Sequence, residues 1–236
     1  MKKIFFVLAL LVATNSVNAQ AFFNKERLAN LDNFDKKVFT WGYFLGFNSY
    51  DFKFDYIEQN ADSNTDVIVE RSAGFNVGLV GDMRLSEYIN LRLEPGLYFS
   101  QRDLTFPNFT EKKDFLRESQ ATYIHVPLLV KISTKRLNNF KPFVVAGVST
   151  SINLSSNEKH PDDNEQGKFR MTNNTNYYEL GFGIDFYLYY FKFTPSIRGV
   201  FAMSDELVRD NDPNSSWTGN IDKMSSRAIF INFTFQ

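Results

Sequence analysis

Two histidines are the residues of this chain best suited to acid–base chemistry. His160 precedes Pro161, Asp162 and Asp163, and a histidine beside carboxylates can act as a general base on a water molecule. The same run is also an ordinary solvated turn. His125 lies in an alternating apolar stretch, and the chain has no cysteine. Nucleophile elbows, phosphate-binding loops and histidine pairs at metal-ligand spacing are absent from the sequence. We therefore expect no catalytic, cofactor-binding or metal-binding residues, and a hydrolase using His160 is the enzyme alternative.

A second chemically capable group consists of polar side chains that alternate with apolar ones along the chain. Six are basic, four are acidic and two are His125 and Tyr123. The charged members are Asp82, Arg84, Arg92, Glu94, Arg102, Lys131, Glu179, Asp185, Lys192 and Arg198. If one interior face holds them all, the near balance of signs favours ion pairs between them over an ion-selective pore, because an unpaired buried charge is costly.

The alternation has a period of two residues, which predicts that these side chains lie on β-strands. The clearest pair runs from Gly74 to Leu85 and from Leu91 to Arg102, and residues 85–90 join the two as a hairpin. Six further stretches have a similar pattern, and about ten residues suffice for a tilted transmembrane strand. These stretches are residues 39–47, 124–132, 142–154, 177–188, 191–203 and 229–235.

The connections between the expected strands alternate between long and short. Long polar connections cover residues 55–70, 103–119, 155–176 and 204–224. Short ones lie near Ser86, at 134–139 and at 188–190. This asymmetry is typical of outer-membrane barrels, whose long loops face outside and whose short turns face the periplasm. We predict an all-β fold, an eight-stranded antiparallel transmembrane β-barrel with both termini in the periplasm. Side chains just fill a barrel of this size, which favours a packed polar core over a pore.

The N-terminus has the pattern of an export signal. Lys2 and Lys3 precede an apolar run of about ten residues, and Val17-Asn18-Ala19 resembles a cleavage site. The run is too short for a membrane-spanning helix, which needs about twenty residues. We predict a signal peptide at residues 1–19, a short periplasmic N-terminal segment at 20–37 and the barrel domain at 38–236. The segment is interpreted as a tail or a cap on the barrel mouth, with a dedicated binding segment as the alternative.

Composition supports a membrane barrel and excludes nucleic-acid binding. The formal net charge is −1, and charges of both signs are spread along the chain, so a basic surface for nucleic acid is absent. The chain has 26 Phe and 11 Tyr although its mean hydropathy is only −0.30. Lipid-facing strands with aromatic girdles account for this combination, and outer-membrane lipids are therefore expected partners.

Aromatic residues in the long connections are candidates for protein contacts. Phe106-Pro107-Asn108-Phe109 and Trp217 place apolar side chains in otherwise polar loops, and aromatic residues are enriched at protein interfaces. They could equally cap the outer rim of the barrel or belong to its aromatic girdle. The sequence leaves these interpretations open.

Two motifs resemble a known family. Residues 30–37, Asn-Leu-Asp-Asn-Phe-Asp-Lys-Lys, followed by Trp-Gly-Tyr-Phe-Leu-Gly-Phe-Asn at 41–48, are similar to the start of the PorT proteins. The strand at 123–131, Tyr-Ile-His-Val-Pro-Leu-Leu-Val-Lys, is similar to a central strand of such barrels. The resemblance covers the mature chain in strand order. The sequence departs from the pattern at His125, where relatives often have an acidic residue, and at its Phe235-Gln236 end.

The PorT resemblance implies an accessory barrel of the type IX secretion system, which exports proteins across the outer membrane and in some bacteria supports gliding motility. The implied partners are proteins of that machinery, and no residue roles are carried over. The alternatives are a structural or small-solute barrel without a role in secretion and a rim hydrolase using His160. We expect no cofactor, no nucleic acid and no small-molecule substrate.

Overall fold

A computed structural model describes residues 29–57, 67–107, 109, 115–158, 169–212, 215 and 217–236. The predicted signal peptide and residues 20–28 of the predicted segment at 20–37 lie outside the described residues, as does His160. The elements are η1 (Phe34–Lys36), β1 (Phe39–Tyr56), β2 (Ile68–Arg71), β3 (Ala73–Arg84), β4 (Ile89–Leu93), β5 (Gly96–Thr105), β6 (Leu116–Ser133), β7 (Phe140–Asn153), β8 (Asn174–Tyr187), β9 (Lys192–Ala202) and β10 (Ile221–Phe235).

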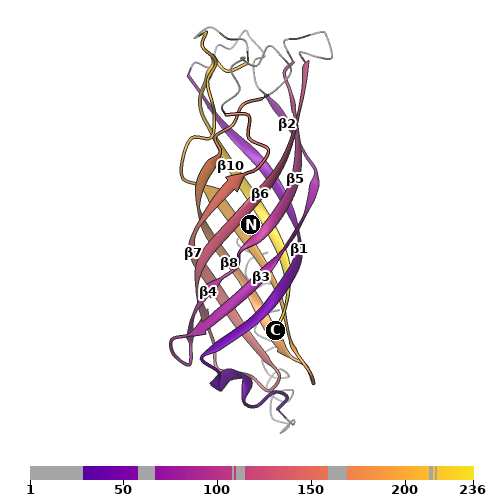
Figure 1. Cartoon of the computed structure of the whole chain (residues 1–236), viewed down its shortest axis with the longest axis vertical. Coiled ribbons are helices and arrows are strands. Elements are labelled where there is room, and N and C mark those ends of the chain that lie inside the picture. The colour runs from indigo at the N-terminus through magenta and orange to yellow at the C-terminus, as the bar shows by residue number, and fades with distance from the viewer. Residues whose placement is uncertain are drawn as a thin grey trace, which may run out of the picture.

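The strands form one closed antiparallel barrel (Figure 1). Following the ring from β1, the neighbours are β10, β9, β8, β7 and β6, and β1 pairs on its other side with β3. β4 and β5 share one place in the ring, because each pairs with both β3 and β6. The short β2 pairs with β5 beyond the end of β3. The predicted eight-stranded barrel is therefore confirmed.

One predicted strand is interrupted. The alternation from Leu91 to Arg102 indicated a single strand, whereas the structure divides it at Glu94 and Pro95 into β4 and β5. Proline has no backbone N–H to donate to a neighbouring strand. Its carbonyl still accepts a hydrogen bond from the Leu79 N–H at 2.9 Å, and the Glu94 N–H donates to the Pro127 carbonyl at 3.3 Å. The barrel wall thus stays closed across the break.

The two faces of the wall follow the alternation. Apolar side chains predicted to face outward are exposed, and Trp41 on β1, Leu79 on β3 and Phe182 on β8 are 74%, 64% and 63% exposed. Of the twelve polar side chains assigned to the interior, eleven are buried and Arg84 is half-buried. An apolar outer surface around a polar interior is the arrangement that lipid imposes on a barrel.

Several strands are longer than a membrane crossing requires. β1 and β6 each contain 18 residues, against about ten for a crossing. Residues 103–105, 116–119 and 221–224, which were predicted to belong to long loops, are strand residues instead. Pairing of β5 with β2 and β6 continues the wall at this end. We call it the long-loop end, and the opposite end, with η1 and the connections near Ser86, 134–139 and 188–191, the short-turn end (Figure 1).

Two glycines make room for an aromatic ring inside the lumen. Gly78 on β3 lies opposite Gly96 on β5. A Cβ atom would approach the Phe44 ring to 2.6 Å at Gly78 and 2.8 Å at Gly96. Phe44 is fully buried, so these positions need residues without a side chain because the ring occupies that space.

Candidate functional site

The lumen nearest the short-turn end contains a chain of ion pairs. Arg92 donates two hydrogen bonds to Asp82, its directly opposite cross-strand neighbour, at 2.9 and 2.7 Å, and a third to Glu94 at 3.1 Å. Arg198 lies 2.8 Å from the other oxygen of Glu94 and 3.5 Å from Glu179, although its N–H groups are not aligned for hydrogen bonds. The prediction that the interior charges pair with one another is confirmed for these residues.

Beside this chain lies a second pair with its own hydrogen bonds. Lys131 Nζ donates to Asp185 at 2.6 Å, and the Thr194 hydroxyl donates to the other Asp185 oxygen at 2.7 Å. The Gln236 side-chain amide donates to Asp82 at 3.2 Å. The carboxylates of Asp82 and Asp185 therefore each have charged and neutral donors within hydrogen-bond distance.

His125 has partners that resemble a catalytic triad. Its Nδ1 lies 2.9 Å from the Ser151 hydroxyl, and its Nε2 lies 2.7 Å from Glu179. In serine hydrolases the ring nitrogens have the opposite roles, with Nε2 at the serine and Nδ1 at the acid. All three side chains are buried inside the lumen, so a substrate has no approach to the Ser151 oxygen in this conformation.

The middle of the lumen is aromatic. Phe230 packs against Tyr98 and Tyr50, with ring centroids 4.7 and 5.5 Å apart, and its ring is edge-on to His125 at 5.6 Å. Tyr50 also stacks on Tyr123 at 5.4 Å. This layer separates the ion pairs near the short-turn end from the polar groups above it.

A further buried arginine lies above the aromatic layer. The Arg102 guanidinium lies 3.9 Å above the Phe52 ring, and it donates hydrogen bonds to Ser226, at 3.1 Å, and to the Tyr123 hydroxyl. Ser226 in turn donates through its N–H and its hydroxyl to Glu206 at 2.9 and 2.8 Å. Burial raises the pKa of the Glu206 carboxyl, and the Arg102 charge and the Ser226 hydrogen bonds oppose this shift.

An apolar cluster fills the barrel at the long-loop end. It is formed by Phe52, Leu104, Phe106, Phe169, Met171, Leu207, Ile221 and Met224. Phe109 and Trp217, which the sequence left as contact, rim or girdle residues, pack against this cluster and stack on each other at 5.0 Å. Of the three interpretations, the structure supports the rim cap, because these side chains cover the end of the lumen. Asn108 lies outside the described residues.

The short-turn end opens into a cavity of about 440 Å³, which we call the mouth pocket. Its walls contain eight basic and five acidic side chains. The basic ones are Lys36, Lys37, Arg84, Lys131, Lys135, Arg136, Lys141 and Lys192, and the acidic ones are Asp32, Asp35, Asp82, Glu87 and Asp185. Arg84, which was assigned to the filled interior, lies at this rim instead. Sequence reasoning could not assemble this set, because it comes from both faces of strand ends, from turns and from the N-terminal segment.

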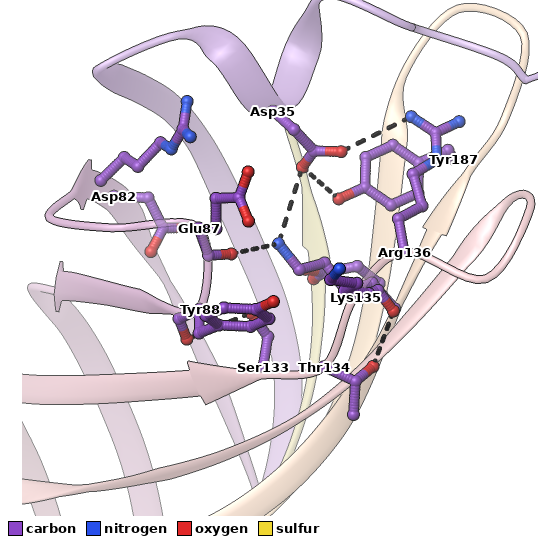
Figure 2. Close-up of polar contacts among 12 residues, drawn as sticks. Asp35, Asp82, Glu87, Tyr88, Ser133, Thr134, Lys135, Arg136 and Tyr187 are labelled. Atoms are coloured by element: carbon purple, nitrogen blue, oxygen red, sulfur yellow. Dashed lines mark hydrogen bonds and ion pairs between the residues drawn. The ribbon is translucent and has the colours of Figure 1, made fainter.

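The segment around η1 is fastened across the mouth pocket (Figure 2). Asp35 accepts a hydrogen bond from the Tyr187 hydroxyl at 2.6 Å and lies 3.6 Å from Arg136 and 3.9 Å from Lys141. The Asn30 backbone N–H donates to the Asn139 side chain at 2.8 Å, and the Arg136 guanidinium lies 3.8 Å from the Tyr187 ring. Residues 30–37 therefore form a cap on the barrel mouth, one of the interpretations given from the sequence.

Replacing Asp35 by alanine is expected to release this cap. Hydrogen bonds to charged groups contribute about 1.5–3 kcal/mol, and 1.4 kcal/mol is a factor of ten in an equilibrium. Amide hydrogen exchange at residues 34, 36 and 37, whose N–H groups bond within the segment, should therefore accelerate about tenfold or more. The control is Asp32→Ala, because Asp32 is exposed and has no ion-pair partner among the described residues. Equal exchange rates in both variants would contradict the fastening role of Asp35.

Two further observations limit the chemistry of the described part of the chain. Among the described residues, no group of three or more His, Cys, Asp or Glu side chains could hold a metal ion. None of the helices in these residues is long and apolar enough to cross a membrane.

A closed barrel of eight antiparallel strands, apolar outside and ion-paired within, defines the class of outer-membrane β-barrels. The family described as "Outer membrane protein beta-barrel domain" matches residues 18–208. The chain belongs to this family, and its location is the outer membrane. Because short turns face the periplasm in outer-membrane barrels, we expect the short-turn end to be the periplasmic end. No curated protein sequence matches the chain.

Solved barrels show distant likeness. OprG from Pseudomonas aeruginosa has 16% sequence identity and a TM-score of 0.44, covering 83% of this chain and 94% of its own. AlkL, solved in DMPC bilayers, has 12% identity and a TM-score of 0.42, covering 90% and 91%. Ail of Yersinia pestis, solved with a heparin analogue, has 10% identity and a TM-score of 0.39, covering 83% and 96%. Likeness at this level says nothing about ligands or activity.

Proposed function

We propose that this protein is an accessory outer-membrane barrel of the type IX secretion machinery that acts through protein contacts at its periplasmic end. The observation that carries the proposal is the place of the PorT-like motif at residues 30–37. Its Asn30, Phe34 and Asp35 contact the periplasmic turns and the end of β8. The motif that resembles the PorT proteins thus forms part of the surface that periplasmic proteins would contact. A role in gliding motility belongs to the same proposal.

The side chains that fill the lumen favour a role through protein contacts over a role in solute passage. Ion pairs, an aromatic layer and an apolar cap follow one another along its length. An alternative structural role without secretion has the same fold. We infer no enzymatic activity for the group formed by Ser151, His125 and Glu179, because all three side chains are buried. The rim hydrolase alternative concerns His160, and the His160→Ala variant tests it. We further propose that residues 1–19 are removed on export.

Deleting the gene tests the secretion role. We expect cargo of the type IX system to accumulate in the periplasm, and a copy of the gene to restore export. Normal export in the deletion strain would contradict the secretion role and leave the structural or small-solute barrel and the rim hydrolase as alternatives. A complementing His160→Ala copy should restore export fully, and any phenotype specific to that variant would favour the hydrolase.

A crosslinking experiment tests the proposed contact face. Tyr190 is 93% exposed in the periplasmic turn between β8 and β9, whereas Tyr178 faces outward on β8 nearer the long-loop end and is 50% exposed. A photoreactive phenylalanine at position 190 should capture a component of the secretion machinery, and the same residue at position 178 should not. Capture restricted to lipid at both positions would contradict the proposal.

A further inference from the structure

Among the described residues, Lys192 differs from the other buried basic residues of the barrel in that its side chain makes neither an ion pair nor a hydrogen bond, whereas Arg102, for example, donates to Ser226 and Tyr123. The Lys192 side chain is 4% exposed. Among the described residues, no oxygen lies within ion-pair or hydrogen-bond distance of its Nζ. The Nζ atom lies 4.8 Å from the centre of the Phe34 ring and borders the mouth pocket. A buried ammonium group without a direct ion pair is unfavourable, so this position is suited to an anion from outside the chain.

The nearest carboxylates already have partners. Asp82 is held by two hydrogen bonds from Arg92, and Asp185 by Lys131 and Thr194. On the other side of the pocket, Asp35 is shared by Arg136 and Lys141. These acids are engaged by other cations, and the pocket walls as a whole contain eight basic and five acidic side chains.

We propose that the mouth pocket binds a phosphate ester, with Lys192 as the principal contact to its phosphate group. A phosphate group, with one negative charge as a diester and up to two as a monoester, suits a pocket with an excess of basic side chains, and Lys ammonium groups bind phosphate as point charges. The cavity of about 440 Å³ falls in the size range of small-molecule sites. The ester is either a soluble periplasmic molecule or a phospholipid headgroup. The inference does not depend on the secretion role.

Two binding measurements on the full mature chain distinguish the sources. The first is calorimetric titration with glycerol 3-phosphate in octyl glucoside, a detergent without phosphate. The second is native mass spectrometry of the protein after exchange from phosphatidylglycerol vesicles into the same detergent. Binding in the first assigns a soluble ester, and retention of lipid without binding in the first assigns a headgroup.

Variants of Lys192 decide whether the site is the one proposed. Lys192→Met should lower affinity about tenfold or more, because a charge-assisted contact is lost, while Lys192→Arg should keep it. The control is Lys53→Met, because Lys53 is an exposed residue of β1 towards the long-loop end. Absence of binding in both measurements, or equal binding by Lys192→Met and the unaltered chain, would overturn the proposal.

A chemical measurement on the unaltered chain covers the case in which Lys192→Met does not fold. Whichever probe binds, glycerol 3-phosphate or phosphatidylglycerol, should slow acetylation of the Lys192 amine about tenfold and leave acetylation of Lys53 unchanged. Peptide mass spectrometry measures both rates. Equal slowing at both lysines, or at neither, would likewise overturn the proposal.

Discussion

Replacing Arg92 by methionine is expected to lower the free energy of unfolding by about 3–5 kcal/mol, because removal of one partner leaves buried charges uncompensated. Arg92 is 1% exposed and bonds Asp82 twice and Glu94 once. Methionine fills much of the space but supplies no donor. Of the hydrogen-bond donors in the described residues, the carboxylate of Asp82 would then keep the Gln236 amide, at 3.2 Å.

Urea unfolding in lipid vesicles, followed by tryptophan fluorescence, measures this loss. The control is Arg227→Met, since Arg227 also bonds an aspartate, Asp51 at 2.8 Å, but its side chain is 54% exposed. Exposed ion pairs contribute about 0–1 kcal/mol, so the control should change stability little. If both variants lose the same stability, burial of the pair is not the cause. Adding Asp82→Asn to Arg92→Met should recover part of the loss, because one uncompensated charge is removed.

Replacing Phe230 by alanine is expected to lower the free energy of unfolding by about 3–5 kcal/mol, the usual cost of truncating a buried aromatic residue. Phe230 is fully buried in the lumen and contacts the rings of Tyr98, Tyr50 and His125. These rings belong to different strands, so they cannot close together over the vacated space without moving the barrel wall. A cavity would remain.

The Phe182→Ala variant distinguishes the two contributions to the lost stability, the cavity and the loss of apolar surface. Phe182 lies on the outer face of β8, where lipid chains can fill the space that the ring leaves. Only the transfer contribution is lost there, about 1.5–3 kcal/mol. The same unfolding measurement should therefore rank Phe230→Ala as the more destabilising change. The reverse order would contradict a tightly packed aromatic layer.

Much of the candidate site was predictable as a set of inward residues but not as a set of contacts. The alternation placed Arg92, Glu179 and His125 on the lumen side, and all three are buried there. It did not show that His125 bonds Glu179, 54 residues away, because such partners depend on the register of strands that are distant in sequence. Phe230 and Tyr98 were missed as lumen residues although they occupy inward positions of the alternation, since apolar side chains were assigned to the lipid face.

The sequence alone predicts the class of fold and the two faces of the barrel wall, because a period of two residues is a local property of each strand and lipid requires one apolar face. It also predicted the alternation of long loops and short turns. How the two ends of the barrel are closed could not be predicted from the sequence. The apolar cap joins residues 52 to 224, and the mouth pocket joins residues 32 to 192. These contacts lie far apart in the chain, and they form only when closure of the barrel brings the strand ends and the N-terminal segment together.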